Sequence, residues 1–241
     1  MSPDQFAAAL KKFGIVLTNR QQRQFAMYYR ILVQANRKVN LTTITSKPEV
    51  YLKHFYDSLT PARFIEKLRH HHLTVCDVGS GAGFPSLPLK IVFPQLRVTI
   101  VDSLNKRINF LRQLIGRLGL KNVSLAHSRA EDFGRSVKHR ERYDFVIARA
   151  VAKLNVLSEF CLPLVKVGGQ FVAMKSIQAA EELRHARFAI QTLGGCVVNQ
   201  RVFKLPNSDE IRNLIVIRKQ KRTPAKYPRR AGIPNRRPLI K

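Results

Sequence analysis

The sequence predicts an α/β protein with a mostly parallel, seven-stranded sheet, an antiparallel edge strand and N-terminal helices. From residue 73 onward, short β-branched apolar runs alternate with helix-length amphipathic stretches, which is typical of a parallel sheet with helices on both faces. The last two apolar runs have no helix-length stretch between them, so they are expected to pair as an antiparallel hairpin. A chain of 241 residues with 45% hydrophobic content can bury one large core with additions.

Residues 1–72 are expected to form a helical segment packed on this core. In residues 20–40, RQQRQFAMYYRILVQANRKVN, apolar side chains recur at helical spacing among charged neighbours. Thr18 or Asn19 is a suitable cap for the start of this helix. A second helix is predicted over residues 48–68, PEVYLKHFYDSLTPARFIEKL, whose initial proline suits a first helical turn.

Residues 73–218 are expected to form the ligand-binding domain. The seven strands are predicted in the runs LTVCDVG (73–79), RVTIVDS (97–103), VSLAH (123–127), YDFVIARA (143–150), GGQFVAMKS (168–176), GGCVVNQRVFKLP (194–206) and RNLIVIRK (212–219). The remaining residues, 219–241, hold nine Lys or Arg, four Pro and no acid. Such a composition cannot build a core, so we expect an extended or disordered basic tail.

Charge is the strongest global feature of the chain. Forty-three Lys and Arg against fifteen Asp and Glu leave a net charge of +28, more than solubility requires. Such a field attracts polyanions, and nucleic acid is favoured over a membrane surface because the basic residues are spread along the whole chain. No apolar stretch is long enough to span a membrane, and the N-terminus lacks the layout of a secretory signal.

The cysteines and histidines favour a cytoplasmic protein without a metal. Cys76, Cys161 and Cys196 are odd in number, far apart and set in apolar runs, as expected of reduced, buried thiols rather than a disulfide framework. No zinc-like spacing occurs, and the run His70–His72 is interpreted as a solvated connector.

A glycine-rich loop after the first predicted strand suits a nucleotide-like ligand without phosphates at the loop. Residues 75–90, VCDVGSGAGFPSLPLK, follow the pattern strand, loop, helix, in which backbone approaches a ligand closely. The spacing is G-x-G-x-G, through Gly79, Gly81 and Gly83, and the third glycine of a dinucleotide fingerprint would fall on Phe84. Pro85 also removes an N–H that a pyrophosphate would use. S-adenosylmethionine, an adenosine joined to an amino acid at a sulfonium, meets this description.

The ends of the next two strands supply residues for such a ligand. Asp102 ends the second strand, twenty-five residues after Asp77, where an acid can accept hydrogen bonds from ribose hydroxyls. NAD enzymes place an acid there too, so this feature alone does not discriminate. After the third strand, Ala130 and Glu131 are placed to border an adenine ring. Asp132 has two interpretations: a functional role, or complementation of a helix N-terminus.

Here the chain resembles class I S-adenosylmethionine-dependent methyltransferases, which have a Rossmann-like fold, and among them the RsmG (GidB) family of ribosomal RNA small-subunit methyltransferases. The resemblance covers most of residues 25–175. The matching stretches are VNLTTI (39–44), HFYDSL (54–59), DVGSGAGFPSLPL (77–89), VDSLNKR (101–107), SRAEDF (128–133) and ARAVAKL (148–154).

The resemblance implies transfer of a methyl group from S-adenosylmethionine to N7 of a guanine in a conserved loop of bacterial 16S rRNA. It also implies that Gly79, Phe84, the Ala130–Glu131 pair and Arg149 contact the cofactor.

The sequence also indicates which acceptor atom of the substrate could receive the methyl group. Methylation of a base carbon usually needs a cysteine nucleophile, and none of the three cysteines is well placed for it. Exocyclic amine methyltransferases carry an Asn/Asp-Pro-Pro-aromatic motif after the fourth strand, where this chain has Ala148-Arg149-Ala150. Guanine N7 loses no proton on attack and needs no general base, which agrees with the lack of an obvious one.

Four residues are catalytic candidates. Arg149 ends the fourth strand at the ligand-binding edge and is expected to orient the cofactor or the guanine edge, although an ordinary ion pair is the alternative. Arg129 and Lys175, at or beyond strand ends, are candidates for holding phosphate or base. Asn40 could bring a polar group over the site. His54 and Asp57, one helical turn apart, more often orient a helix than perform acid–base catalysis.

The alternatives are a methyltransferase with a small-molecule or protein substrate, an RNA-binding ribosome-assembly factor with a vestigial pocket, and a nicotinamide dehydrogenase, which Phe84 and Pro85 disfavour. The expected partner is 16S rRNA or the small ribosomal subunit, and a monomer is expected.

Overall fold

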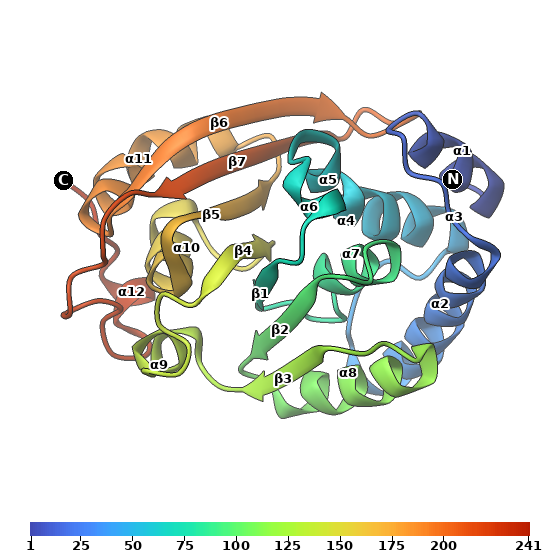
Figure 1. The fold of residues 1–241 in the computed structure, drawn as a ribbon, viewed down its shortest axis with the longest axis horizontal. Coiled ribbons are helices and arrows are strands. Elements are labelled where there is room, and N and C mark those ends of the chain that lie inside the picture. Colours follow the sequence, from blue (N-terminus) through green and yellow to red (C-terminus); the bar gives the residue numbers. More distant parts are fainter.

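The computed structural model describes residues 1–241 as a seven-stranded sheet with helices on both faces (Figure 1). The strand order is β3-β2-β1-β4-β5-β7-β6, with every neighbouring pair parallel except the two pairs that β7 makes. The strands are β1 (Thr74–Val78), β2 (Arg97–Asp102), β3 (Val123–His127), β4 (Tyr143–Arg149), β5 (Val165–Lys175), β6 (Gly195–Lys204) and β7 (Ile211–Lys219). The predicted fold class is therefore confirmed.

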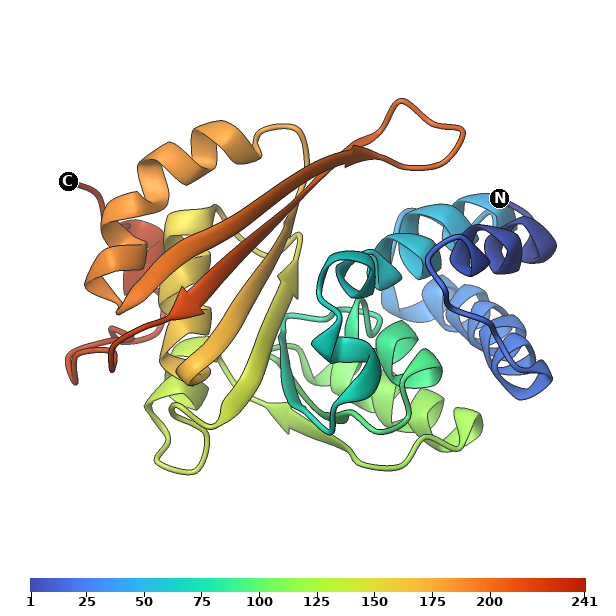
Figure 2. The ribbon, with the colours of Figure 1, turned by 45° about the horizontal axis from the view of Figure 1, so that its top comes forward.

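The predicted hairpin is also present, and it forms one end of the sheet. β6 and β7 pair antiparallel, and β7 inserts between β5 and β6, so the reversed strand is the penultimate one (Figure 2). The chain builds outward from β1 to β3 and returns to β4 on the other side of β1. In an open parallel sheet, this reversal leaves a crevice at the carboxyl ends of the strands, where ligands bind.

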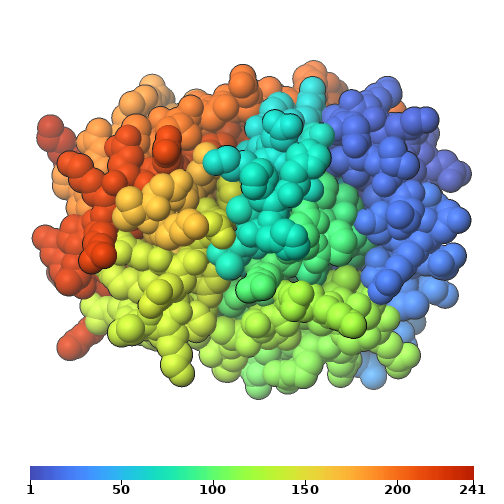
Figure 3. Space-filling view, viewed as in Figure 1, coloured from blue at the N-terminus to red at the C-terminus, as the bar shows by residue number.

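Two hydrophobic clusters, one on each face of the sheet, form the core. One has 38 buried residues and includes apolar side chains of α1 (Pro3–Lys11), α2 (Asn19–Val39), α7 (Ser86–Val92) and α8 (Asn105–Leu118). The other has 26 buried residues and includes those of α9 (Ala130–Arg135), α10 (Leu154–Cys161), the short 3₁₀ turn η2 (Leu162–Leu164) and α11 (Ala179–Thr192). The N-terminal helices thus share a core with one sheet face, and the space-filling view shows the blue N-terminal residues directly against the teal and green part of the chain (Figure 3).

The predicted helix over residues 20–40 is α2. Of the two candidate caps, Thr18 is the one used: its hydroxyl accepts the Gln21 N–H, and the Gln21 side chain accepts the Thr18 N–H in return. Such a reciprocal box satisfies two backbone donors that a helix start leaves free. The helix ends at Asn40, whose φ of 49° places it in the left-handed region.

The second predicted helix, over residues 48–68, is interrupted rather than continuous. It consists of α3 (Lys47–Glu49), a π-helical segment η1 (Val50–Tyr56), α4 (Asp57–Leu59), α5 (Pro61–Phe64) and α6 (Lys67–His70). Ile65, with φ −124°, separates the last two. Five of the seven η1 residues are buried, and four of them belong to the hydrophobic cluster that includes α1, α2 and α7.

The prediction that residues 219–241 are extended or disordered is wrong. Tyr227 and Thr223 are buried, and the segment ends in a short helix, α12 (Ile233–Arg236). Arg140 donates to the carbonyls of Thr223 and Tyr227, both at 2.7 Å. The segment builds no core of its own, but polar contacts to residues already ordered by the sheet hold it in place. No helix of the chain is both long and apolar enough to cross a membrane.

Candidate cofactor-binding site

The loop between β1 and α7 brings bare backbone to the carboxyl edge of the sheet. Gly79 and Gly83 have φ values of 72° and 101°, which L side chains rarely adopt. A Cβ on Gly79 would lie 2.9 Å from Val151 Cγ2, and one on Gly83 would lie 2.7 Å from the Tyr28 hydroxyl. Both positions therefore require glycine on grounds of conformation and of space.

The N–H groups of this loop are largely used inside the protein. Gly79 donates to the Val101 carbonyl at 2.8 Å, and Gly83 and Phe84 both donate to the Ser80 carbonyl at 3.0 Å. Gly81 donates to Asp102 Oδ2 at 3.2 Å. These donors do not present the nest of free N–H groups that binds a pyrophosphate, and an anionic phosphate would also meet the Asp102 carboxylate. The geometry agrees with a ligand that has no phosphates at the loop.

Asp102 is fixed at the end of β2 by backbone donors. Its Oδ1 accepts the Leu104 N–H at 2.9 Å, its Oδ2 accepts that of Gly81, and the Arg107 guanidinium lies 3.5 Å from Oδ2. An ionised carboxylate has about four lone-pair sites, so acceptor capacity remains for ligand hydroxyls. The side chain is held in place before any ligand arrives.

A cavity of about 370 Å³ lies beside these residues, within the range of small-molecule sites. It is lined by Val78, Gly79, Val101, Asp102, Ser103, Arg107, Ser128, Arg129, Ala130, Glu131, Ala150, Val151, Ala152, Phe160 and Asn235. Two carboxylates and apolar walls face the same space. These acceptors and apolar side chains fit a nucleoside, whose hydroxyls need acceptors and whose base needs an apolar slot.

Residues near the C-terminus complete one wall of this cavity. Glu131 is buried at the start of α9, and its Oε1 accepts the Gly232 N–H at 2.9 Å. Asn235 of α12 lines the cavity. Arg229 anchors the segment by donating to both carboxylate oxygens of Glu159, which is buried in α10, at 2.7–3.2 Å.

Five of the predicted site residues meet at this cavity: Gly79, Asp102, Arg129, Ala130 and Glu131. Arg129 is exposed at its rim, immediately before α9. The other predicted residues do not line the cavity.

Asp77 lies beneath the glycine loop rather than in the cavity. It is fully buried, and its Oδ2 accepts the Ser86 N–H at 3.1 Å, which fastens the start of α7 to β1. Burial raises the pKa of this carboxyl to about 7, against the opposing effect of the hydrogen bonds from Ser86. Gly81 and Gly83 do not line the cavity either, although Gly81 donates to Asp102, which does.

Arg149 and Phe84 lie between the sheet and the N-terminal helices. Arg149 donates to Asp57 Oδ2 and to the Lys53 carbonyl, both at 2.9 Å, and its guanidinium lies 5.2 Å from the Phe84 ring centroid. Phe84 is buried and stacks on His54, with ring centroids 4.5 Å apart. These contacts tie the glycine loop to the helical segment.

His54 extends this cluster as a neutral side chain. Burial first, and then the nearby Arg149 charge, lower the pKa of His54 to about 3. Arg149 Nη2 is 3.3 Å from His54 Nδ1, which therefore accepts, so His54 Nε2 carries the hydrogen and donates to Thr42 Oγ1 at 2.9 Å. His54 and Asp57 both contact Arg149, whereas the sequence suggested that such a pair orients a helix.

Lys175 and Asn40 do not reach the cavity. Lys175 is nearly buried, with Nζ 2.7 Å from both Glu182 Oε2 and the Ala152 carbonyl, so its charge is already paired. Asn40 is exposed at the end of α2. Its neighbour in the structure, Asn36, makes the loop contacts instead, by accepting from the N–H groups of Leu41 and Thr42.

Sequence reasoning missed several residues of the site. Ser103 and Arg107 follow Asp102 closely, and that proximity was an available signal. Phe160 and Asn235 lie far along the chain and carry no motif, so only the fold brings them to the cavity. Arg212, which donates to Asp57 Oδ2 at 3.3 Å, was likewise unmarked by any pattern.

Solved structures share the fold at low sequence identity. The TrmN structure from Thermus thermophilus aligns with a TM-score of 0.53 and 18% identity, over 68% of this chain and 48% of that one. A SAM-dependent methyltransferase from Aquifex aeolicus aligns with a TM-score of 0.54 and 19% identity, over 74% of this chain and 96% of that one. At these identities the likeness establishes the architecture alone.

Curated relatives match along the whole chain. Proteins named ribosomal RNA small subunit methyltransferase G are 60% identical in Levilactobacillus brevis and 56% identical in Lactiplantibacillus plantarum. Each alignment spans 240 residues and covers 99% of this chain, with 99% and 98% of the respective relatives. The family described as GidB, rRNA small subunit methyltransferase G, matches residues 21–215. The chain belongs to this family.

Proposed function

We propose that the protein transfers a methyl group from S-adenosylmethionine to N7 of one guanine in the 16S rRNA of the small ribosomal subunit. The observation that carries this proposal is the cavity that joins Gly79, Asp102, Ala130 and Glu131 in a chain of this family. The net charge of +28 suits an RNA substrate. The N7 position follows from the family rather than from the geometry.

The cavity residues divide the work of holding the cofactor. Asp102 would accept hydrogen bonds from the ribose hydroxyls, and Ala130 and Glu131 would border the adenine. The backbone at Gly79 would lie against the remainder of the ligand. When bound, S-adenosylmethionine supplies an electrophilic methyl group on a sulfonium. The chain contributes position and exclusion of water, which dominate catalysis of an in-line displacement.

The thiols support a nitrogen acceptor over a base carbon. Cys76 and Cys161 are fully buried, and burial raises the pKa of both thiols well above its ordinary value. A neutral thiol inside the core cannot attack a base. Cys196 is on β6 and does not line the cavity. Guanine N7 attacks through a lone pair it already has, so the absence of a thiolate and of a charged His54 agrees with this acceptor.

The remaining roles are assigned by position. Arg129, at the rim, is proposed to hold rRNA phosphate or the guanine edge. Arg149 is proposed as a positioning residue, because Lys53, Asp57 and His54 take three of its five N–H donors and it does not line the cavity. We further propose a cytoplasmic monomer. The exposed large hydrophobic residues are distributed over many elements, whereas an obligate interface needs a contiguous apolar patch.

The test is radiolabelled methyl transfer to three acceptors: small ribosomal subunits, free 16S rRNA and a protein extract, all from cells that lack this gene. We expect label in rRNA, in one or both rRNA acceptors. Label in the protein extract alone would contradict the substrate. Tight RNA binding without any transfer would instead indicate an assembly factor with a vestigial pocket.

A further inference from the structure

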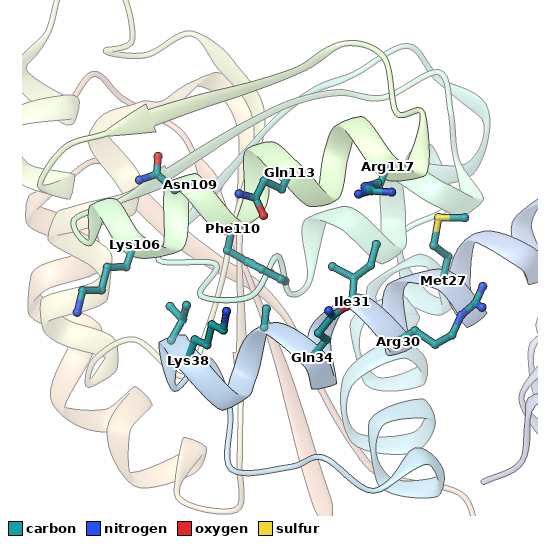
Figure 4. Close-up of a pocket in the computed structure, with 12 residues that line it drawn as sticks. Met27, Arg30, Ile31, Gln34, Lys38, Lys106, Asn109, Phe110, Gln113 and Arg117 are labelled. Atoms are coloured by element: carbon teal, nitrogen blue, oxygen red, sulfur yellow. The ribbon is translucent and has the colours of Figure 1, made fainter.

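A second concave surface lies apart from the cofactor cavity, between α2 and α8 (Figure 4). This groove has a volume of about 860 Å³. It is lined by Met27, Arg30, Ile31, Gln34, Ala35, Lys38, Val39, Lys106, Asn109, Phe110, Gln113 and Arg117. Gln24 joins the two helices beyond its Arg117 end by donating to the Leu118 carbonyl at 2.7 Å. Lys38 and Lys106 both lie at the opposite end (Figure 4).

The groove carries positive charge that nothing in the protein neutralises. Arg30, Lys38, Lys106 and Arg117 are exposed, and none of them is in an ion pair. The imbalance extends to the whole of both helices, since α2 has five basic residues, α8 has four, and neither has an Asp or Glu. Helices normally favour acids in the first turn and opposite charges at i,i+4. Neither α2 nor α8 has such acids or such pairs. Their positive charge therefore points to an anionic ligand that supplies the missing negative charge.

The apolar floor of the groove indicates which kind of anionic ligand the groove suits. Met27, Ile31, Ala35 and Val39 are partly exposed apolar residues, and Phe110 lies beneath them. The amides of Gln34, Asn109 and Gln113 stand among the basic residues (Figure 4). A double helix presents only phosphates and groove edges, which an apolar floor would not suit. A single strand presents phosphates for the cations, base faces for the apolar floor and base edges for the amides.

The groove leads toward the cofactor cavity. Lys106 lines the groove, while the next residue, Arg107, lines the cofactor cavity and lies 3.5 Å from Asp102. Along α8, the distance from Lys106 to Arg117 is about 16 Å at 1.5 Å per residue. At about 3.4 Å per nucleotide of a stacked strand, this length accommodates about four or five nucleotides.

We infer that the groove between α2 and α8 binds a single-stranded rRNA segment that flanks the methylated guanine. This inference rests on the proposed function and adds the surface that holds the substrate. The basic residues bind the phosphates, the apolar floor packs against bases and riboses, and the Lys38–Lys106 end directs the strand to the cofactor cavity.

The experiment compares two quadruple variants in salt-dependent binding to 16S rRNA and to small subunits. The groove variant is Arg30→Gln, Lys38→Gln, Lys106→Gln and Arg117→Gln. The matched control is Arg184→Gln, Arg187→Gln, Arg201→Gln and Arg218→Gln, which removes the same charge from exposed, unpaired positions on α11, β6 and β7. All eight side chains are exposed, and binding of S-adenosylhomocysteine checks that each variant has kept its fold and its cofactor cavity.

The groove variant is expected to lower the slope of log Kd against log salt concentration by about 3. Each phosphate contact to a single strand contributes about 0.7 to this slope, and the variant removes four basic residues. Extrapolated from 1 M to 0.15 M salt, this is a loss of affinity on the order of 100-fold. The control is expected to change the slope by less than about 1. A third variant, Ile31→Glu, places a carboxylate on the floor and is expected to weaken RNA binding without removing any basic residue.

Equal slopes for the groove and control variants would overturn the inference. Loss of binding to small subunits with unchanged affinity for free 16S rRNA would also overturn it, because the groove would then hold a protein. If the wild-type protein neither binds nor methylates rRNA, the proposed function itself fails, whatever the groove variants do.

Discussion

Gly79 and Gly81 have similar backbone conformations but different surroundings. Their φ values are 72° and 60°, so an alanine at either position has the same conformational cost of about 1–2 kcal/mol. A Cβ on Gly81 meets nothing within 4 Å, whereas one on Gly79 meets Val151, which lines the cavity. The two substitutions therefore separate strain in the loop from intrusion into the site.

We predict that Gly79→Ala weakens binding of S-adenosylhomocysteine at least about tenfold, because Val151 must move by several tenths of an ångström. Gly81→Ala should lower the free energy of unfolding by a similar amount but affect binding much less. Calorimetric titration and urea unfolding of both variants measure these quantities. Equal affinities for the two variants would show that Gly79 does not shape the cavity.

Asp77 gives the stability of the protein a pH dependence of known sign. Its pKa is about 7 in the folded protein, against 3.8 for an ordinary Asp. Between these values the folded protein binds more protons at this site than the unfolded chain, so its contribution to the free energy of unfolding falls as the pH rises. The contribution is fully present below pH 4 and is lost by pH 7, a change on the order of 4 kcal/mol.

We expect Asp77→Asn to remove this fall while it keeps an acceptor for the Ser86 N–H. Urea unfolding of both proteins from pH 4 to pH 8 measures the difference. The variant should gain stability relative to the wild type as the pH rises from 4 to 7. Parallel curves for the two proteins would contradict the raised pKa.

The C-terminal segment shows how one pair of side chains can order an element. Glu159 is buried in α10, and Arg229 supplies its charge partner, 70 residues away along the chain. We predict that Arg229→Met lowers the free energy of unfolding by about 3 kcal/mol, because the buried Glu159 carboxylate loses its charge partner and keeps only the backbone N–H of residue 229. Arg230, its exposed neighbour, serves as the control, since Arg230→Met should change stability by less than about 0.5 kcal/mol. Equal effects would mean that the pair does not anchor the segment.

Elements differ in how far the sequence predicts them. α2 is predicted well because its apolar spacing and its Thr18 cap are local features. The break and π-helical turn within residues 48–68 are not, because an apolar pattern of this length does not distinguish an α-helix from the wider π turn. The order of residues 219–241 is not predictable from composition, since it depends on Glu159 and Glu131, which are distant in sequence.

In the candidate site too, some features can be predicted from the sequence and others cannot. Asp102 ends β2, Gly79 follows β1, and Ala130 and Glu131 begin the helix after β3, so the alternation of strands and helices predicts that they meet. Arg149 ends a strand too, but its side chain pairs with Asp57 of the helical segment, a contact that strand order cannot reveal. Lys175 pairs with Glu182, which is another contact that strand order cannot reveal. Position in the sheet is predictable, whereas the partner of a long charged side chain is not.

The sheet with its loops and the helix pair α2 and α8 have separate proposed tasks. The sheet and its loops hold the cofactor, while α2 and α8 present the unpaired positive charge that receives RNA. The cluster of Phe84, His54 and Arg149 joins them, since it connects the glycine loop to the N-terminal helices. We propose that this cluster keeps the cofactor cavity and the groove in a fixed relation.

The central claim is that this chain methylates one guanine of 16S rRNA at N7, with the cavity at Asp102 as the cofactor site. The most direct measurement is to label small subunits and 16S rRNA from cells lacking this gene and to map the product by cleavage chemistry specific for 7-methylguanine. We expect cleavage at a single guanine with the wild-type protein and strongly reduced cleavage with Asp102→Asn. Asp132→Asn serves as the control and should behave as wild type, because Asp132 is exposed at the start of α9 and does not line the cavity. Label in another base or atom, or full activity of Asp102→Asn, would contradict it.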